Sequence, residues 1–108
     1  MPEAHKPAPC FSHVVILWTN PAKERAVEQL LEGAERYLRP IAGIVSFHAG
    51  KMVISERPVV DQTYQVALNV TFKDKAAQDR YQVDPLHIEF VQKVLKPLVT
   101  KVVVYDFE

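Results

Sequence analysis

The clearest pattern along the chain is the alternation of apolar and polar or small residues in 64–72. Tyr64, Val66, Leu68, Val70 and Phe72 alternate with Gln65, Ala67, Asn69 and Thr71. A period of two predicts a β-strand, because successive side chains of a strand point to opposite faces. Three further strands are predicted at residues 13–19, 43–50 and 101–107, where β-branched and aromatic residues are frequent or turn residues mark the ends.

Helical spacing of apolar residues dominates between these strands. Residues 21–38 have apolar residues on one side and mostly glutamates on the other, and Asn20 is the expected N-cap. Residues 73–83 predict a short second helix. Asp84 is then expected to cap another helix that begins at Pro85 and runs to about 95 or 98.

The order of predicted elements is β-α-β-β-α-β, which is the order of ferredoxin-like folds. It predicts an α+β protein whose four-stranded antiparallel sheet has helices on one face only. The first and last strands are nevertheless apolar on both faces: Val14 and Ile16 alternate with Val15 and Leu17. The uncovered face needs a second layer, so we expect a homodimer formed through the open sheet face.

Composition limits the classes of partner. The chain has 108 residues, enough for one domain, and equal numbers of basic and acidic residues, 13 each, so nucleic acid is not an expected partner. The single cysteine, Cys10, excludes an internal disulfide, and no apolar run is long enough to span a membrane. These features predict a cytoplasmic protein. Residues 1–12, rich in proline, are expected to form a flexible N-terminal arm before a domain of residues 13–108.

Four stretches of the sequence resemble one known family. They are HVVILW, IAGIVSFHAGK, YQVALNVTFKDKAAQDRYQVDPLHIEF and VLKPLVTKVVVYDFE, and they are spread over the whole chain after the N-terminal arm. In these stretches the chain resembles the stress-responsive A/B-barrel (Dabb) domain family. The resemblance implies a dimeric α+β barrel built on the ferredoxin-like order, and a stress-associated role.

The resemblance also implies candidate site residues. One plant branch of the family is similar to a polyketide cyclase, in which a tyrosine and a histidine of a Tyr-x-x-[His/Asp]-Pro-x-His motif act as the catalytic pair. Those positions are Tyr81 and His87 here, and the histidine that opens the first strand matches as His13. Two positions depart from that branch, because Asp84 and Val66 stand where it has histidines.

The residues themselves allow acid–base chemistry. His87 is the third residue of its predicted helix, where the helix dipole and burial both favour a neutral imidazole, as a general base requires. Tyr81 could donate a hydrogen bond to a carbonyl or enolate oxygen. Alternatively, and as buried histidines more often do, His87 could bond to Tyr81 or to a backbone carbonyl as a packing residue of the core. We expect His13, Leu31, Val66 and Leu68 to form the wall of any ligand pocket.

Three functions therefore stay open, and whether the protein is an enzyme is undecided. The first is a non-enzymatic or small-ligand-binding stress-associated homodimer, whose ligand would be small and hydrophobic. The second is a cofactor-free enzyme on a hydrophobic carbonyl compound, similar to a cyclase, monooxygenase or isomerase, with His87 as base and Tyr81 as hydrogen-bond donor. The third is a haem-handling barrel. No spacing of ligating residues predicts a metal site, and we expect no cofactor.

Overall fold

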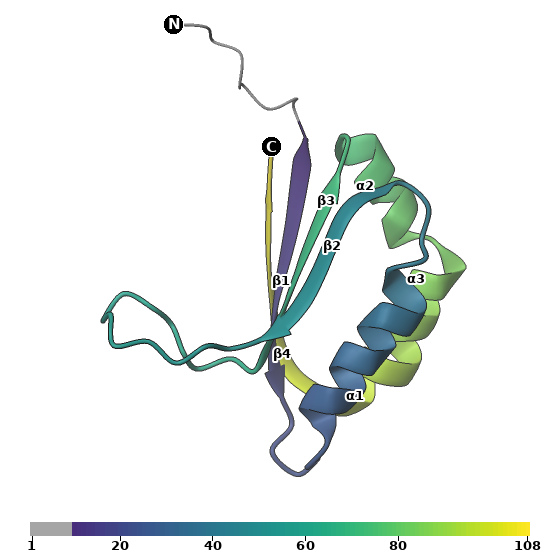
Figure 1. Cartoon of the computed structure of the whole chain (residues 1–108). Helices are drawn as coiled ribbons and strands as arrows, with labels where there is room; N and C mark the ends of the chain where they lie inside the picture. Colours follow the sequence, from purple (N-terminus) through teal and green to yellow (C-terminus); the bar gives the residue numbers. More distant parts are fainter. Residues whose placement is uncertain (1–9) are drawn as a thin grey trace, which may run out of the picture.

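The computed structural model describes residues 10–108 and has two layers, a sheet and a set of helices (Figure 1). The strands are β1 (Phe11–Thr19), β2 (Ile44–Lys51), β3 (Val66–Phe72) and β4 (Val99–Phe107). They form one antiparallel sheet in the order β2-β3-β1-β4. The predicted ferredoxin-like α+β fold is confirmed.

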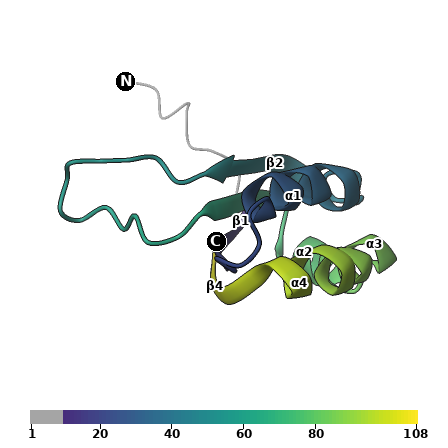
Figure 2. The same ribbon diagram turned by 90° about the horizontal axis from the view of Figure 1, so that it is seen from below.

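All the helices lie on one side of the sheet (Figures 1 and 2). They are α1 (Ala26–Gly33), α2 (Lys75–Gln82), α3 (Pro85–Phe90) and α4 (Lys96–Leu98), with π-helical turns η1 (Ala34–Leu38) after α1 and η2 (Val91–Leu95) after α3. Asp84 caps α3 as expected, since its Oδ1 accepts a hydrogen bond from the Leu86 N–H at 2.9 Å. Within residues 10–108, no helix has the length and apolar character needed to cross a membrane.

The sequence placed the start of the first helix and of the first strand wrongly. Asn20 does accept a hydrogen bond from Ala22 N–H, at 2.9 Å, but the chain then makes two successive i→i+3 turns and Arg25 has non-helical dihedrals. Continuous helix therefore begins at Ala26, not at residue 21. The strand begins at Phe11, so the last two residues of the expected arm 1–12 belong to β1, and residues 1–9 of that arm lie outside the described part.

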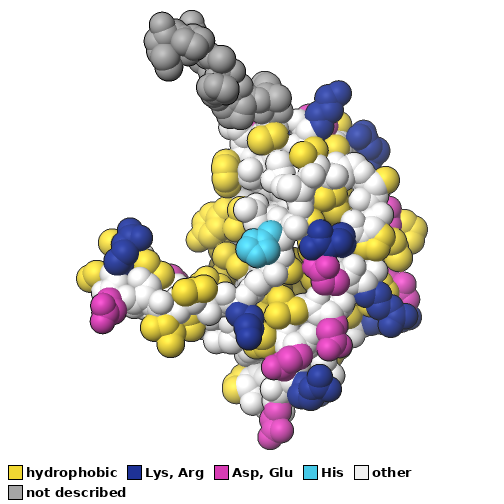
Figure 3. Space-filling view, viewed as in Figure 1, with side chains coloured by type: hydrophobic (Ala, Val, Ile, Leu, Met, Phe, Trp, Pro, Cys, Tyr) yellow, Lys and Arg dark blue, Asp and Glu magenta, His cyan; other side chains and the backbone are white. Residues whose placement is uncertain are grey.

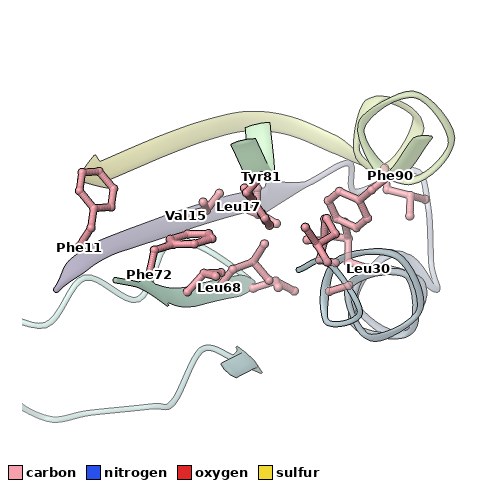
Figure 4. Packing of buried hydrophobic residues seen from close by; sticks show 14 of the residues in the cluster. Phe11, Val15, Leu17, Leu30, Leu68, Phe72, Tyr81 and Phe90 are labelled. Atoms are coloured by element: carbon pink, nitrogen blue, oxygen red, sulfur yellow. The ribbon is translucent and has the colours of Figure 1, made fainter. Parts of the chain in front are cut away.

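The hydrophobic core lies between the helices and the inner face of the sheet. Alternate residues of β1 and β3 supply the sheet side, from Phe11 to Leu17 and from Val66 to Phe72. Figure 4 shows Leu30 of α1 and Phe90 of α3 on the helix side of this core. α1 approaches η2 closely at Gly33, where a Cβ atom would lie 2.7 Å from Val94 Cγ1, so a larger residue would push the helices apart.

The other face of the sheet, called here the open face, has no cover in this chain. Residues paired across β1 and β4 share a face, so Val14 pairs with Tyr105 and Ile16 with Val103 on the open face. Tyr105 and Phe107 are each 59% exposed there. The open face is therefore an apolar surface of the kind that marks an interaction site.

Candidate active or binding site

A cavity of about 150 Å³ lies between the inner face of the sheet and the helical segment α3–η2. Most of its lining is apolar: Val15, Leu38, Leu68, Phe90, Val91, Leu95, Val102 and Val104. Its polar groups are His13, Tyr81, Gln82 and His87. Val102 and Val104 are partly exposed, which leaves the cavity accessible beside the edge strand β4. An apolar pocket with a few convergent polar groups is typical of a small-molecule site.

Three elements bring the aromatic rings of the site together. Tyr81 comes from the last turn of α2, His87 from the first turn of α3, and His13 from the start of β1. The Tyr81 ring centroid lies 4.8 Å from that of His87, 5.9 Å from that of His13 and 5.0 Å from that of Phe72. The chain bends at Asp84 and Pro85 between α2 and α3, and this bend places Tyr81 against His87.

The far end of the chain supplies a carboxylate to the site. β1 and β4 pair so that His13 lies opposite Asp106, and the Asp106 Oδ1 atom lies 2.6 Å from His13 Nδ1. His13 is 6% exposed. The Nδ1–H group of His13 donates a hydrogen bond to this carboxylate. Asp106 thus fixes the orientation of a buried histidine.

The hydroxyl of Tyr81 is available to a ligand. Its side chain is almost wholly buried, and burial raises the pKa of this hydroxyl above its ordinary value, so it stays protonated at neutral pH. Among residues 10–108, no side chain forms a hydrogen bond with this hydroxyl, and no side-chain nitrogen or oxygen is both buried and without a partner. Tyr81 is one of the residues that line the cavity. The hydroxyl therefore reaches the cavity, where it can donate a hydrogen bond.

His87 is held neutral by its surroundings. Burial is the main cause that lowers its pKa from 6.5, and the neighbouring His13 acts in the same direction. The backbone of Gln82 and the carboxylate of Asp84 oppose this shift without reversing it. A neutral imidazole beside a protonated phenol can accept a proton while the phenol stabilises negative charge on an oxygen.

This shift predicts a contribution of His87 to the pH dependence of stability. Because folding lowers the pKa of His87, the unfolded chain binds more protons between the lowered value and 6.5, so the free energy of unfolding rises with pH in that window. The His87→Gln variant should lose less stability than the unchanged protein when the pH falls from about 7.5 to about 5. Urea unfolding at both pH values measures the difference. Equal losses in the two proteins would contradict the predicted coupling.

Four of the predicted site residues line the cavity: His13, Leu68, Tyr81 and His87. Val66 and Leu31 do not. Val66 is fully buried opposite Leu17, at the other end of β1 from His13, and Leu31 packs against the core from α1. The sequence did not lead us to predict Asp106 as a site residue. A signal was present, because antiparallel pairing of the first and last strands brings a histidine at the start of one opposite an aspartate at the end of the other.

Within the described range 10–108, no group of three His, Cys, Asp or Glu side chains is placed to hold a metal ion. A larger and more open groove of about 600 Å³ lies between α1 and α4, but it contains none of the predicted site residues and is lined mainly by surface side chains such as Lys23, Glu32 and Arg36. The predicted site residues that line a pocket thus all lie in the smaller cavity.

Comparison with known proteins agrees with this fold. The sequence profile of the stress responsive A/B barrel domain, Dabb, matches residues 11–108. The chain belongs to the Dabb family. The comparison with curated proteins finds no match.

Solved structures with the same fold are numerous. A Dabb family protein with a ferredoxin-like fold from Mesorhizobium loti has a TM-score of 0.75 and 27% identity, over 92% of this chain and 95% of that one. A dimeric ferredoxin-like protein of unknown function from Jannaschia sp. has a TM-score of 0.73 and 23% identity, over 93% and 99%. The hydroxynitrile lyase from Passiflora edulis has a TM-score of 0.73 and 17% identity, over 94% of both chains. At such identities the last two comparisons show a shared fold with this Dabb chain and do not transfer a function.

Proposed function

We propose that this Dabb protein is a homodimer that binds a small, largely apolar molecule with one polar atom, and that it has a stress-associated role. The observation that supports the proposal best is the cavity of about 150 Å³ with the hydroxyl of Tyr81 and the rings of His13 and His87 along an apolar wall. The stress-associated role is inferred from the family alone.

The volume of the cavity limits the size of the ligand. Pockets for drug-sized ligands and cofactors measure about 300–1,000 Å³, whereas an apolar cavity of about 150 Å³ binds benzene. A ligand of one six-membered ring and one oxygen therefore fits, and a haem does not. This is why we prefer a small ligand to the haem-handling function.

Dimerisation is supported by the open face. Apolar side chains on both faces of β1 and β4 have helices to cover only one of them, and a second copy related by a two-fold axis covers the other. Several proteins of the same fold are described as dimeric, among them the Jannaschia protein. The homodimer through the open face is thus the assembly we propose.

Benzaldehyde is a suitable probe of the cavity, because it has one ring and one carbonyl oxygen. We expect calorimetric titration to detect its binding, and the Tyr81→Phe variant to bind it about 5- to 10-fold more weakly, since one hydrogen bond is lost. Toluene has the same ring and no oxygen, so its affinity should be equal in both proteins. Failure of both probes to bind, or an equal loss for both in the variant, would contradict the proposed site.

Proton transfer on a bound carbonyl compound is the second candidate function. It is favoured by the pair of His13 and Asp106 at 2.6 Å and by the neutral His87 beside the protonated Tyr81. His87 would take the proton from the carbon next to the carbonyl. The electron pair of that C–H bond would form the C=C bond of the enolate, the π pair of the C=O bond would move to the oxygen, and Tyr81 would donate a hydrogen bond to that oxygen. The hydroxynitrile lyase is an enzyme with the same fold.

Exchange of solvent deuterium into cyclohexanone tests this second function. Exchange that is faster with the protein than with buffer, and that the His87→Gln variant loses, would establish it. Exchange at the rate of buffer alone would leave ligand binding as the only function proposed for the cavity.

A further inference from the structure

The connection between β2 and β3, residues 52–65, extends away from the body of the protein. It is called here the arm and is separate from the N-terminal arm of residues 1–12. Figures 1 and 2 show that it projects on the side opposite the helices, which is the side of the open face. Two contacts at the base of the arm agree with this. Trp18 lies on the same face of β1 as Val14 and Ile16, and its indole N–H donates to Thr63 Oγ1 at 3.0 Å. The Trp18 and Tyr64 rings also meet edge to face, with their centroids 6.5 Å apart. The arm is thus joined to the open face.

Hydrogen bonds within the arm hold it in one shape. Ser55 N–H donates to Gln62 Oε1 at 3.0 Å and Gln62 Nε2 donates to the Ser55 carbonyl at 2.7 Å, which ties its two sides together. A turn bond from Val60 N–H to the Arg57 carbonyl, at 3.1 Å, closes its tip. An arm ordered by its own bonds has already lost much of the conformational entropy that binding would otherwise cost.

The apolar side chains of this ordered arm face solvent in the single chain. Val53 is 76% exposed, Ile54 81% and Val59 80%, the three highest values among the large apolar residues of the described chain. Figure 3 shows hydrophobic side chains on the arm and on the adjoining edge of the body, with a concave corner between them. Apolar surface on both sides of a corner is typical of a protein–protein contact.

We propose that the arm of each protomer packs against the second copy of this chain in the homodimer. This inference rests on the proposed homodimer. A copy seated on the open face must occupy the side from which the arm projects, so the arm lies beside that copy. A two-fold axis makes the contact reciprocal, and each protomer then buries the Val53, Ile54 and Val59 side chains of its own arm against the other. The arms add a second contact to the sheet-to-sheet contact and hold the dimer at its flanks.

The test replaces the three apolar side chains of the arm together, as Val53→Ser, Ile54→Ser and Val59→Ser. Since each is more than three-quarters exposed, the protomer should keep its far-UV circular dichroism spectrum. The dimer should dissociate about 100-fold more readily, because six apolar side chains in all lose their contacts. Sedimentation velocity over a dilution series measures the dissociation constant.

A matched control replaces two exposed apolar residues on the helix side, Val83→Ser and Ile88→Ser, which are 70% and 50% exposed. This control should dimerise as tightly as the unchanged protein. If the unchanged protein is a monomer, the proposed homodimer fails and the arm contact with it. If the unchanged protein is a dimer and the arm variant dimerises as tightly as the control, the homodimer stands and the arm contact is wrong, leaving the arm for a different partner.

Discussion

The Tyr105→Asp substitution is expected to convert the protein from a dimer to a monomer. Tyr105 lies on the open face of β4, where it is 59% exposed in the single chain, so the protomer should tolerate the change. In the proposed dimer the two-fold axis places two new carboxylates in a contact from which water is excluded, and an unpaired charge buried there costs several kcal/mol. We expect the dissociation constant to rise by about 1,000-fold or more, since each 1.4 kcal/mol is a factor of ten.

Light scattering at micromolar concentration measures this change. The control is Ile88→Asp, which adds the same charge at a half-exposed apolar position of α3, on the helix side. The control should stay dimeric, and both variants should keep the circular dichroism spectrum of the unchanged protein. A Tyr105→Asp variant that is as dimeric as the control would show that the open face is not the interface.

The fold could be predicted because its signals are local. Alternation in 64–72 gave a strand where β3 lies, and the Asp84-Pro85 pair gave the start of α3 to the residue. The two-sided apolar pattern of β1 and β4 predicted a sheet with one uncovered face, which the structure has. Each of these inferences needs only the period of side chains along one element.

Errors arose where the outcome depends on residues far apart in sequence or on competing turns. Asn20 followed by proline fits both a helix cap and an isolated turn, and only the geometry of 20–25 decides between them. The pairing of His13 with Asp106 joins residues 93 positions apart, and the position of Val66 on β3 depends on the register with β1. Sequence pattern fixes the face of a strand residue but not its height along the sheet, so it could not tell Val66 from Leu68 as a cavity residue.

The packing of the Tyr81 ring makes Tyr81 a position at which substitution should strongly lower stability. Its ring is 1% exposed and meets His13, Phe72 and His87 at centroid distances of 4.8–5.9 Å. Tyr81→Ala removes all these contacts and leaves a larger cavity beside the start of α3. We expect a loss of about 3–5 kcal/mol in the free energy of unfolding, as for other large buried aromatic residues.

Tyr81→Phe separates packing from hydrogen bonding at this position. It keeps the ring and removes only a hydroxyl that faces the cavity, so the loss measured by urea unfolding should be less than about 1 kcal/mol. A large loss in Tyr81→Phe would mean that the hydroxyl is bonded within the protein and is not available to a ligand. A small loss, together with weaker binding of benzaldehyde, would mean that the ring supports the fold while the hydroxyl serves the cavity, and one residue would then have both roles.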